Sequence, residues 1–324
     1  MTTISLNRNA VKQVQDAIEH AEELQIKSWK ADCGSTLVDM GMSCPGSWKA
    51  GQVFVEAGFG GQGRAGYGRF EIGPFTVPSI DVWVDNPVLA VVASQAGCWE
   101  LGKGEFAQIG SGPARAVALA DRWSGHGYRD PDPSAVVVQL QTTRVPSDDL
   151  CRFVANACQV EPEQVYVVFA PTACLVGAIQ VASRTVEQVM IKLFLRGFDI
   201  HAVKFGFGTA PVAPLLGDEG EMMGRANDAL FYGGDGNDTY EGGNGTDTAV
   251  IGGTYADYSF EVSGTKLIAT SSAGNVETID WETIEYVEFD DGLYSITSVD
   301  SADTIQLAAA AAGGTTVILL PVTT

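Results

Sequence analysis

The stretch Val165-Tyr166-Val167-Val168-Phe169-Ala170 leads through Pro171-Thr172-Ala173-Cys174 into a mostly apolar run that ends near residue 195. A short run of β-branched and aromatic residues is typical of a buried strand, whereas the longer run is typical of a helix. A second buried-strand pattern, Ala135-Val136-Val137-Val138-Gln139-Leu140, comes before them. Two buried strands and a long apolar helix predict a layered α/β or α+β domain.

The rest of the N-terminal part contains further helix and strand patterns. Val11, Val14, Ile18 and Ala21 recur at helical spacing after Asn9, which we expect to be the N-cap of the first helix. The sequence predicts three more helices, at about residues 87–96, 113–123 and 148–158, and three strands, at 53–55, 80–84 and 203–207. This irregular order of elements argues against a repeat solenoid.

The net charge of −21 is divided unevenly along the 324 residues. Residues 1–232 hold 25 acidic and 18 basic residues, whereas residues 233–324 hold 15 acidic residues and a single base, Lys266. Because an acidic surface repels phosphate groups, this composition argues against nucleic acids and anionic membrane surfaces as partners. With 45% hydrophobic residues the chain is nevertheless expected to fold.

The sequence also indicates where the protein works. Its N-terminus has no apolar signal region, and no stretch offers the roughly 18 consecutive apolar residues of a membrane span. All six cysteines precede residue 233 and no pair has C-x-x-C spacing, so we expect buried free thiols in a reducing compartment. These features predict a soluble, cytoplasmic protein.

One glycine-rich loop resembles a nucleotide-binding motif. Gly58-Phe59-Gly60-Gly61-Gln62-Gly63 matches G-x-G-x-x-G, but more glycines and a strand-like run follow where a dinucleotide site needs a helix. We therefore interpret it as a flexible loop that lines a substrate site. The three histidines lack metal-ligand spacing and the chain has no G-x-S-x-G elbow, which argues against a zinc hydrolase or a Ser-His-Asp triad.

A second glycine-flanked turn, Ile109-Gly110-Ser111-Gly112-Pro113, precedes a predicted helix. Ser111 stands where an N-cap is expected and Pro113 lies in the first turn. Two interpretations remain open here. The turn either only caps the helix, or its free N–H groups bind an anionic or carbonyl group of a ligand.

Arg184 and Glu187 stand three residues apart within the long apolar run. Most pairs at this spacing are exposed ion pairs that contribute little to stability. This pair lies among Val181, Val186 and Val189, so we expect it to be at least partly buried. A buried carboxylate that a guanidinium holds in its charged form can act as a base toward water.

Residues 1 to about 234 resemble methenyltetrahydromethanopterin cyclohydrolase. The matching runs occur in the order of that family: Asp32-Cys33-Gly34, Glu56 with the glycine loop, Asp85-Asn86-Pro87-Val88-Leu89-Ala90, Ser111-Gly112-Pro113-Ala114-Arg115-Ala116, Cys174-Leu175-Val176-Gly177-Ala178-Ile179-Gln180-Val181, Gly206-Phe207-Gly208-Thr209-Ala210-Pro211 and Met223-Gly224-Arg225-Ala226-Asn227-Asp228-Ala229. The resemblance implies the layered α/β domain of that family. It also implies hydrolysis of the N5,N10-methenyl bridge of the pterin to the N5-formyl compound in one-carbon metabolism.

The same resemblance assigns roles to individual residues. Glu187 would take a proton from the attacking water, and Arg184 would keep Glu187 ionised and oriented. The cationic methenyl carbon is already electrophilic, so no catalytic metal or other cofactor is expected. The substrate-binding residues implied are Asp32, Glu56, Asp85, Ser111, Gly112, Arg115, Gln180 and Asn227. Family members are often trimeric, which predicts a homo-oligomer; folate in place of methanopterin is a lesser alternative.

From Gly233 the sequence changes to two consecutive nonapeptides, residues 233–241 and 242–250, of the type G-G-x-G-x-D-x-U-x. They resemble RTX (haemolysin-type) calcium repeats, and residues 284–293 resemble the β segments that follow such arrays. The resemblance implies Ca²⁺ binding by Asp238 and Asp247. Because stacked neighbours complete such sites, a glycine-rich segment that binds weakly or not at all is the alternative.

The sequence therefore predicts an α+β chain in three parts: a cyclohydrolase-like domain at 1–232, a small all-β segment with RTX-like repeats at 233–298, and a tail at 299–324 whose structure it does not indicate. Family members continue with about eighty residues of α+β structure where this chain has the repeats. The competing hypothesis is a non-catalytic, calcium-responsive or secreted binding protein that keeps a remnant of the fold.

Overall fold

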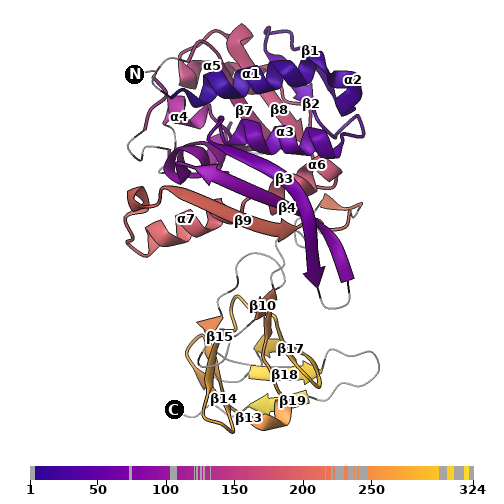
Figure 1. Ribbon diagram of the computed structural model, residues 1–324, viewed down its shortest axis with the longest axis vertical. Coiled ribbons are helices and arrows are strands. Elements are labelled where there is room, and N and C mark those ends of the chain that lie inside the picture. The colour runs from indigo at the N-terminus through magenta and orange to yellow at the C-terminus, as the bar shows by residue number, and fades with distance from the viewer. Residues whose placement is uncertain are drawn as a thin grey trace. The chain divides into compact units, whose positions relative to one another are not determined.

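The computed structural model divides into two compact units, Met1–Met222 and Met223–Thr324 (Figure 1). The residues that the structure describes are 4–72, 75–102, 108–119, 121, 123–124, 126, 128–131, 133–215, 217–219, 222, 230–232, 237, 239–240, 242, 247–298, 305–309 and 317–320. Of residues 72, 75, 230–232, 297–298, 305–309 and 317–320, only the backbone is described.

A six-stranded mixed sheet forms the centre of the first unit. Its strands, in spatial order, are β1 (Lys27–Lys30), β2 (Thr36–Asp39), β8 (Val165–Ala170), β7 (Val136–Gln141), β6 (Gln108–Ser111) and β5 (Trp99–Leu101). β2, β8 and β7 are parallel, whereas β1, β6 and β5 pair antiparallel with their neighbours. Burial on both faces explains the near-continuous apolar runs of β7 and β8.

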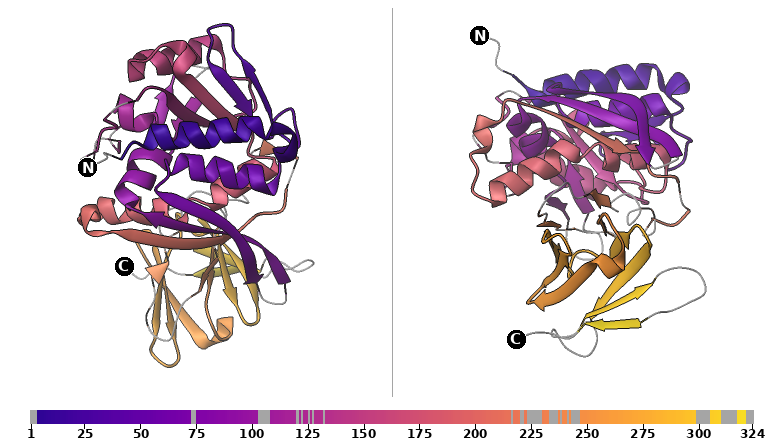
Figure 2. Two further views of the ribbon diagram at one scale, coloured as in Figure 1. Left: turned by 45° about the horizontal axis from the view of Figure 1, so that its top comes forward. Right: turned by 60° about the horizontal axis from the view of Figure 1, so that its bottom comes forward.

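Helices cover both faces of this sheet. Val137 packs with α1 (Leu6–Glu19) and α3 (Trp48–Gly58), which lie side by side in Figure 2, whereas Val138 packs with α5 (Asp148–Cys158) on the opposite face. This alternation follows from the two-residue period of a strand. The predicted helix at 148–158 and its Ser147 cap are confirmed, as are strands at the two buried runs.

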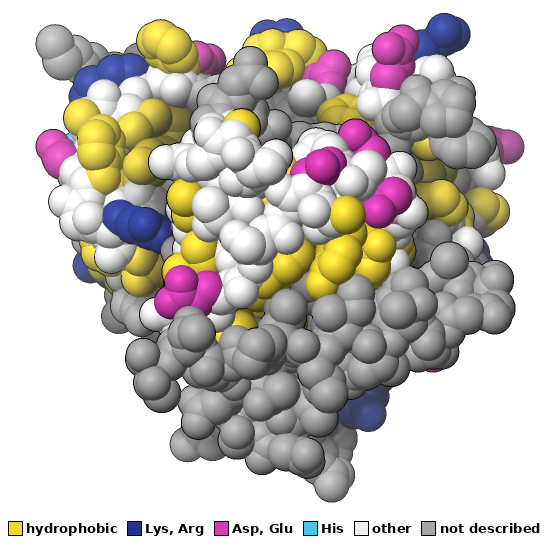
Figure 3. Space-filling view, turned by 90° about the horizontal axis from the view of Figure 1, so that it is seen from below, with side chains coloured by type: hydrophobic (Ala, Val, Ile, Leu, Met, Phe, Trp, Pro, Cys, Tyr) yellow, Lys and Arg dark blue, Asp and Glu magenta, His cyan; other side chains and the backbone are white. Residues whose placement is uncertain are grey.

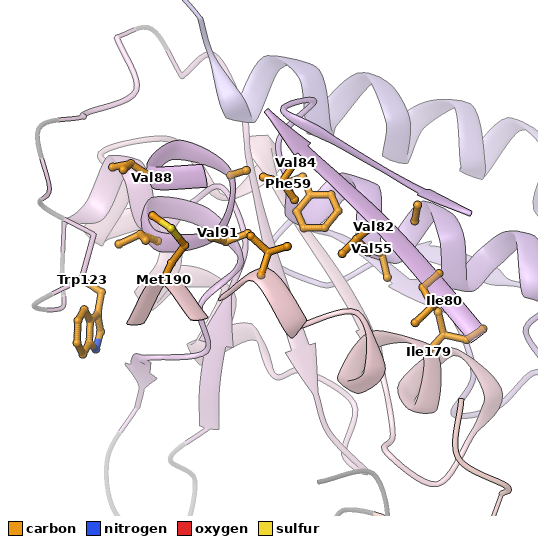
Figure 4. Packing of buried hydrophobic residues seen from close by; sticks show 14 of the residues in the cluster. Val55, Phe59, Ile80, Val82, Val84, Val88, Val91, Trp123, Ile179 and Met190 are labelled. Atoms are coloured by element: carbon orange, nitrogen blue, oxygen red, sulfur yellow. The ribbon is translucent and has the colours of Figure 1, made fainter. Parts of the chain in front are cut away.

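A second, three-stranded antiparallel sheet packs beside α3. It consists of β3 (Gly63–Ile72), β4 (Phe75–Asp85) and β9 (Phe205–Pro211). Its inner face contributes Ile80 and Val82 to a hydrophobic cluster with Phe59, the C-cap of α3, and Ile179 of α6 (Leu175–Ala182), and Figure 4 shows Ile179 next to Ile80.

The predicted helix at 87–96 is a π-helix, η1 (Val88–Gln95), in which the Ala96 amide donates to the Val91 carbonyl five residues earlier. π-Helical segments are rare and are frequent at functional sites. The mixture of helices and sheets agrees with the predicted α+β class.

The long helix predicted to end near residue 195 is two helices, α6 and α7 (Thr185–Leu195), that meet at Ser183 and Arg184. The Ser183 hydroxyl donates to the Gln180 carbonyl at 2.7 Å, and Arg184 has non-helical dihedral angles (φ −84°, ψ 12°). A serine that bonds to a preceding carbonyl offers the backbone an alternative to helix continuation. The break places Arg184 at the N-cap of α7.

Three other predictions were wrong in type or extent. Residues 53–55 lie inside α3, not in a strand, because Ala50, Phe54 and Ala57 are buried at helical spacing. α1 begins at Leu6 with Ser5 as its cap, so Asn9 lies within the helix. The helix predicted at 113–123 is a single turn, α4 (Arg115–Ala118).

Two sheets form the described part of the second unit. One has the order β10 (Leu230–Tyr232), β12 (Thr248–Val250), β16 (Tyr286–Phe289), β17 (Gly292–Ser298), β18 (Ile305–Ala309) and β19 (Val317–Leu320). The other has the order β11 (Thr239–Tyr240), β15 (Val276–Asp280), β14 (Lys266–Ser271) and β13 (Tyr258–Ser263). Buried residues from both sheets, such as Tyr240, Leu267 and Val287, share one hydrophobic core.

The nonapeptide region alternates between these two sheets. β10 and β12 are parallel neighbours in one sheet, with Leu230 opposite Thr248, and β11 between them in sequence pairs in parallel with β15 of the other sheet. Figure 3 views the molecule from below and shows acidic and hydrophobic side chains close together on that face. Within the described residues of the whole chain, no helix is long and apolar enough to cross a membrane.

Candidate active site

Arg184 and Glu187 form a largely buried ion pair at the start of α7. Arg184 Nη1 lies 2.8 Å from Glu187 Oε2, and the side chains are 17% and 3% exposed. The break between α6 and α7 creates this geometry, because Arg184 precedes the helix while Glu187 lies in its first turn. A carboxylate at a helix N-terminus is favoured by the helix dipole as well as by the guanidinium. The structure thus supplies a desolvated carboxylate that keeps contact with a cation.

Three other segments surround the Arg184 guanidinium. Nη1 also donates to the backbone carbonyl of Gln95, the last residue of η1, at 3.0 Å, and Nη2 lies 3.5 Å from Ser111 Oγ at the end of β6. Gly97 is exposed and so close that a Cβ there would lie 3.4 Å from Nη1 and 3.8 Å from Ile109 Cγ2. The pair is therefore buried by the fold but borders on solvent at Gly97 and Ile109.

Two amide side chains close to this pair carry polar atoms without a protein partner. Gln95 and Gln180 are 3% and 5% exposed, and the Oε1 atom of each accepts no hydrogen bond from the described residues. Gln95 Nε2 reaches only to Ser183 Oγ, at 3.4 Å. A buried acceptor without a donor is costly, so such atoms normally bind water or a ligand. Among the described residues, the site therefore has two acceptor atoms without a donor.

Arg115 is completely buried. It forms a bidentate ion pair with Asp121, with Nε to Oδ2 at 2.9 Å and Nη2 to Oδ1 at 2.8 Å. Its Nη1 donates to the carbonyls of Val92 and Ser94 near the end of η1. These protein acceptors engage its guanidinium, and the expected contact of Arg115 with substrate stays a prediction.

Ser111 and Gly112 lie beside the pair, but not as a helix cap. The N-cap of α4 is Ala114, and with four residues this helix has no N-terminal binding site, so the capping role expected for Ser111 was wrong. Gly112 has a φ of +94°, and its amide donates to the Ser94 carbonyl at 2.9 Å. Only glycine adopts such a conformation readily, and here it connects β6 to the end of η1.

Glu56 lies on α3, where it accepts hydrogen bonds from Gln52 Nε2 and the Ala65 amide. Asp32 is exposed in the turn after β1, four strand positions from β6, which corresponds to about 19 Å. Asp85 is exposed at the end of β4. Asn227 lies outside the described residues. Of the predicted residues, Ser111, Gly112 and Gln180 therefore lie near the ion pair, and Asp32 does not converge on it.

The predicted calcium ligands fall in the second unit. Asp238 lies outside the described residues, and Asp247 is 1% exposed, with its carboxylate next to Gly242. The Asp247 amide donates to Glu285 Oε2 at 2.7 Å. Across the described residues, no three His, Cys, Asp or Glu side chains are grouped as a metal site requires.

Sequence reasoning missed Gln95 and Asp121. Gln95 ends the run Val88-Leu89-Ala90-Val91-Val92-Ala93-Ser94-Gln95, and an amide inside so apolar a segment was an available signal. Nothing in the sequence connects Asp121 to Arg115, since the pairing depends on the turn after α4.

A cavity of about 930 Å³ lies at the carboxyl end of β7 and does not include the Arg184–Glu187 pair. It is lined by Leu101, Gln108, Gln141, Arg144, Phe153 and Glu219, among others.

The fold therefore presents a buried carboxylate paired with a guanidinium at a helix break. Comparison with known families matches the chain, over residues 5–259, to the family described as Cyclohydrolase (MCH). The protein belongs to this cyclohydrolase family.

Curated relatives agree with this assignment. The methenyltetrahydromethanopterin cyclohydrolase of Methanocaldococcus jannaschii is 37% identical over 236 residues, which cover 71% of this chain and 73% of that protein. The enzymes of the same name from Methanosarcina barkeri and Methanothermobacter marburgensis are 34% and 37% identical, over 73% and 71% of this chain and 74% and 73% of their own lengths. The family match extends past Gly233 and includes both nonapeptides, so the boundary expected near residue 234 does not mark its end.

Proposed function

We propose that this protein hydrolyses the N5,N10-methenyl bridge of methenyltetrahydromethanopterin to give N5-formyltetrahydromethanopterin. The observation that carries the proposal is the Arg184–Glu187 pair, 2.8 Å apart at the break between α6 and α7, in a chain of the cyclohydrolase family. The family's named relatives support this substrate. We also propose a cytoplasmic location, which a substrate of one-carbon metabolism supports.

The proposed reaction needs one water and one base. Water attacks the cationic methenyl carbon, a C–O bond forms, and Glu187 takes the proton that the water loses. The adduct then collapses as the bond from this carbon to N10 breaks, N10 receives a proton and the carbonyl of the N5-formyl group remains. One proton is released overall, and no metal or redox group takes part.

Arg184 orients the base in this mechanism. It fixes the Glu187 carboxylate through the 2.8 Å contact and is itself fixed by the Gln95 carbonyl, so the base is oriented before substrate arrives. The amide oxygens of Gln95 and Gln180 can accept the hydrogens of the attacking water or of the pterin. We propose Ser111, Gly112 and Gln180 as the substrate-facing residues among those that the sequence indicated.

We further propose that the enzyme is a homo-oligomer, a trimer by resemblance to its family. Exposed aromatic side chains support an interface on the outer face of the three-stranded sheet. Phe205, Phe207 and Trp83 are 78%, 60% and 48% exposed, and Trp83 lies directly opposite Phe207 in the strand register. Contiguous exposed apolar surface of this kind typically marks a protein interface.

For the second unit we propose a short RTX-like β-roll that binds Ca²⁺. The support is the parallel pairing of β10 with β12 and the position of β11 in the other sheet, because a β-roll alternates between two sheets at each nonapeptide. Asp238 and Asp247 are the expected ligands.

One assay tests the proposed activity. Purified protein is mixed with methenyltetrahydromethanopterin, with and without Ca²⁺, and loss of the methenyl chromophore is followed. Turnover that does not depend on Ca²⁺ supports the cyclohydrolase. Absence of turnover, together with a Ca²⁺-induced rise in β content, would instead favour the non-catalytic binding protein. The corresponding folate, used as a second substrate, tests pterin preference.

A further inference from the structure

Behind the Arg184–Glu187 pair lies a second ion pair, Arg115–Asp121, that cannot take part in chemistry directly. Arg115 is 0% exposed and the Asp121 side chain 8% exposed. Burial tends to raise the pKa of Asp121, but the hydrogen bonds and charge of Arg115 and the amides of Trp123 and Ser124 outweigh it and lower that pKa. Two fully engaged partners of this kind need a structural or a positioning explanation.

The contacts of Arg115 lead to the end of the π-helix. The last carbonyls of a helix have no intrahelical donor, and those of Val92 and Ser94 are instead satisfied by Arg115 Nη1, at 3.1 and 2.9 Å. The next carbonyl, that of Gln95, accepts from Arg184 Nη1 at 3.0 Å. Two guanidinium groups therefore bind one short backbone segment: Arg115 binds the carbonyls of Val92 and Ser94, and Arg184 binds that of Gln95.

Cys98 follows this backbone segment by three residues. Burial raises the pKa of its thiol, and the charges of Arg115, Asp121, Glu187 and Arg184 contribute to that pKa.

We propose that Arg115 and Asp121 are positioning residues: through the carbonyls of Val92 and Ser94 they fix the end of η1, so that the Gln95 carbonyl holds Arg184 in line with Glu187. This inference rests on the proposed cyclohydrolase function. It replaces the substrate-binding role that the sequence suggested for Arg115.

The first test is Arg115→Lys, which keeps the positive charge but loses the planar fork that serves Asp121 and two carbonyls together. A misplacement of the Arg184–Glu187 pair by about 1 Å can lower the rate by up to roughly 100-fold. We therefore expect kcat to fall about 10- to 100-fold, with KM within about twofold of wild type. A rise in KM with unchanged kcat would overturn the proposal, because it would indicate contact with substrate.

A second variant separates positioning from folding. Arg115→Met with Asp121→Asn removes both charges, while the asparagine oxygen can still accept from the Trp123 and Ser124 amides that Asp121 Oδ1 serves now. Replacing both members of a buried pair is often tolerated, so this protein should fold. It should nevertheless show the kcat loss, because the Val92 carbonyl has lost its Arg115 donor and the Ser94 carbonyl keeps only the Gly112 amide. Wild-type kcat in this variant would refute the proposal.

A double-variant cycle with Arg184 measures whether the kcat effects of the two substitutions are coupled. A purely structural role of Arg115 would not produce such coupling. In an Arg184→Lys background the group that Arg115 positions is already changed, so Arg115→Lys should cost less than about twofold more. Additive effects would overturn the inference. Asp39→Asn is the matched control, since Asp39 is fully buried on β2 and its carboxylate accepts from the Gly41, Met42 and Ser43 amides; it should lower stability without changing the cycle.

The proposed activity and the positioning role of Arg115 and Asp121 are contradicted by different results. Wild-type protein that does not consume methenyltetrahydromethanopterin removes the proposed function and this inference with it. Wild-type protein that turns over, with an additive cycle, removes only the positioning role.

Discussion

The two arginine–carboxylate pairs of the first unit have the same chemistry in different surroundings. Both close at 2.8 Å, yet Arg184 is 17% exposed next to the exposed Gly97, whereas Arg115 is 0% exposed. Arg115 donates four hydrogen bonds to protein acceptors, two of them to one carboxylate. Arg184 contacts one carboxylate and one carbonyl closely and Ser111 only at 3.5 Å. Access to solvent, not the type of pair, therefore decides which one can meet water and substrate.

Glu187→Gln tests whether the Arg184–Glu187 pair carries the chemistry, and we expect it to have the largest effect on kcat. The amide keeps the shape of the side chain but cannot take a proton, so kcat should fall about 10²- to 10⁴-fold with little change in KM. Steady-state loss of the methenyl chromophore measures both constants. Glu23→Gln, at an exposed acid paired with Lys49, is the matched control and should behave like wild type.

Arg184→Lys should have the next largest effect. Lysine keeps the charge but cannot donate to Glu187 and the Gln95 carbonyl from one planar group, so we expect kcat to fall about 10- to 100-fold. Arg8→Lys, at an exposed arginine of α1, controls for the exchange itself. Equal kcat for Arg184→Lys and wild type would show that the charge alone suffices.

Gly208→Ala tests the support of the α7 N-terminus from β9. A Cβ at Gly208 would lie 2.0 Å from Thr185 Oγ1 and 2.7 Å from Thr185 Cβ, so α7 must shift or the strand must bend. We expect a loss of about 1–3 kcal/mol in the free energy of unfolding, with reduced kcat because Glu187 is two residues from Thr185. Denaturant unfolding measures the first. Gly217→Ala meets no atom within 4 Å and should be neutral.

Acid unfolding tests the ionisation of Asp121 in the buried Arg115–Asp121 pair. The pKa of Asp121 is lowered only in the folded protein, so its stabilising contribution is present at neutral pH and is lost as pH falls below about 4. Asp121→Asn lacks this contribution. Its free energy of unfolding should therefore fall less steeply than that of wild type between about pH 5 and pH 3. Parallel curves would contradict the assigned ionisation.

Calcium should have the smallest effect on turnover. Its expected ligands, Asp238 and Asp247, belong to the second unit, whereas the proposed chemistry uses residues of the first. Removal of Ca²⁺ with a chelator should leave kcat within about twofold, while circular dichroism reports any change in β content. A large dependence of kcat on Ca²⁺ would mean that the two units are coupled.

The sequence predicted those parts of the fold in which local pattern and burial agree. The uninterrupted apolar runs of β7 and β8 and the Ser147-capped α5 are of this kind, because their two-sided burial or amphipathic face is visible in the residue order. Residues 53–55 were misassigned because an apolar run of three residues fits a strand as well as a helix. The π-helix at 88–95 has no separate sequence pattern, since its stability depends on donors from Arg115 and Arg184.

The site shows the same division. Arg184 and Glu187 were found because charged residues three apart in an apolar run are unusual. Arg115 was singled out, but its bonds to Asp121 and to the carbonyls of η1 were not predicted, because they follow only from the turn after α4. Gln95 was missed because its importance comes from a backbone carbonyl and an unpartnered amide oxygen, neither of which a residue name reveals.

The different roles of the two pairs are tested most directly by neutralising one carboxylate in each pair and comparing the two proteins under one set of conditions. Glu187→Gln and Asp121→Asn are assayed for kcat with methenyltetrahydromethanopterin and for the free energy of unfolding. We expect Glu187→Gln to fold with near wild-type stability and to lose at least about 100-fold in kcat. Asp121→Asn should lose more stability and less activity. Turnover by Glu187→Gln at the parent rate would contradict the central claim.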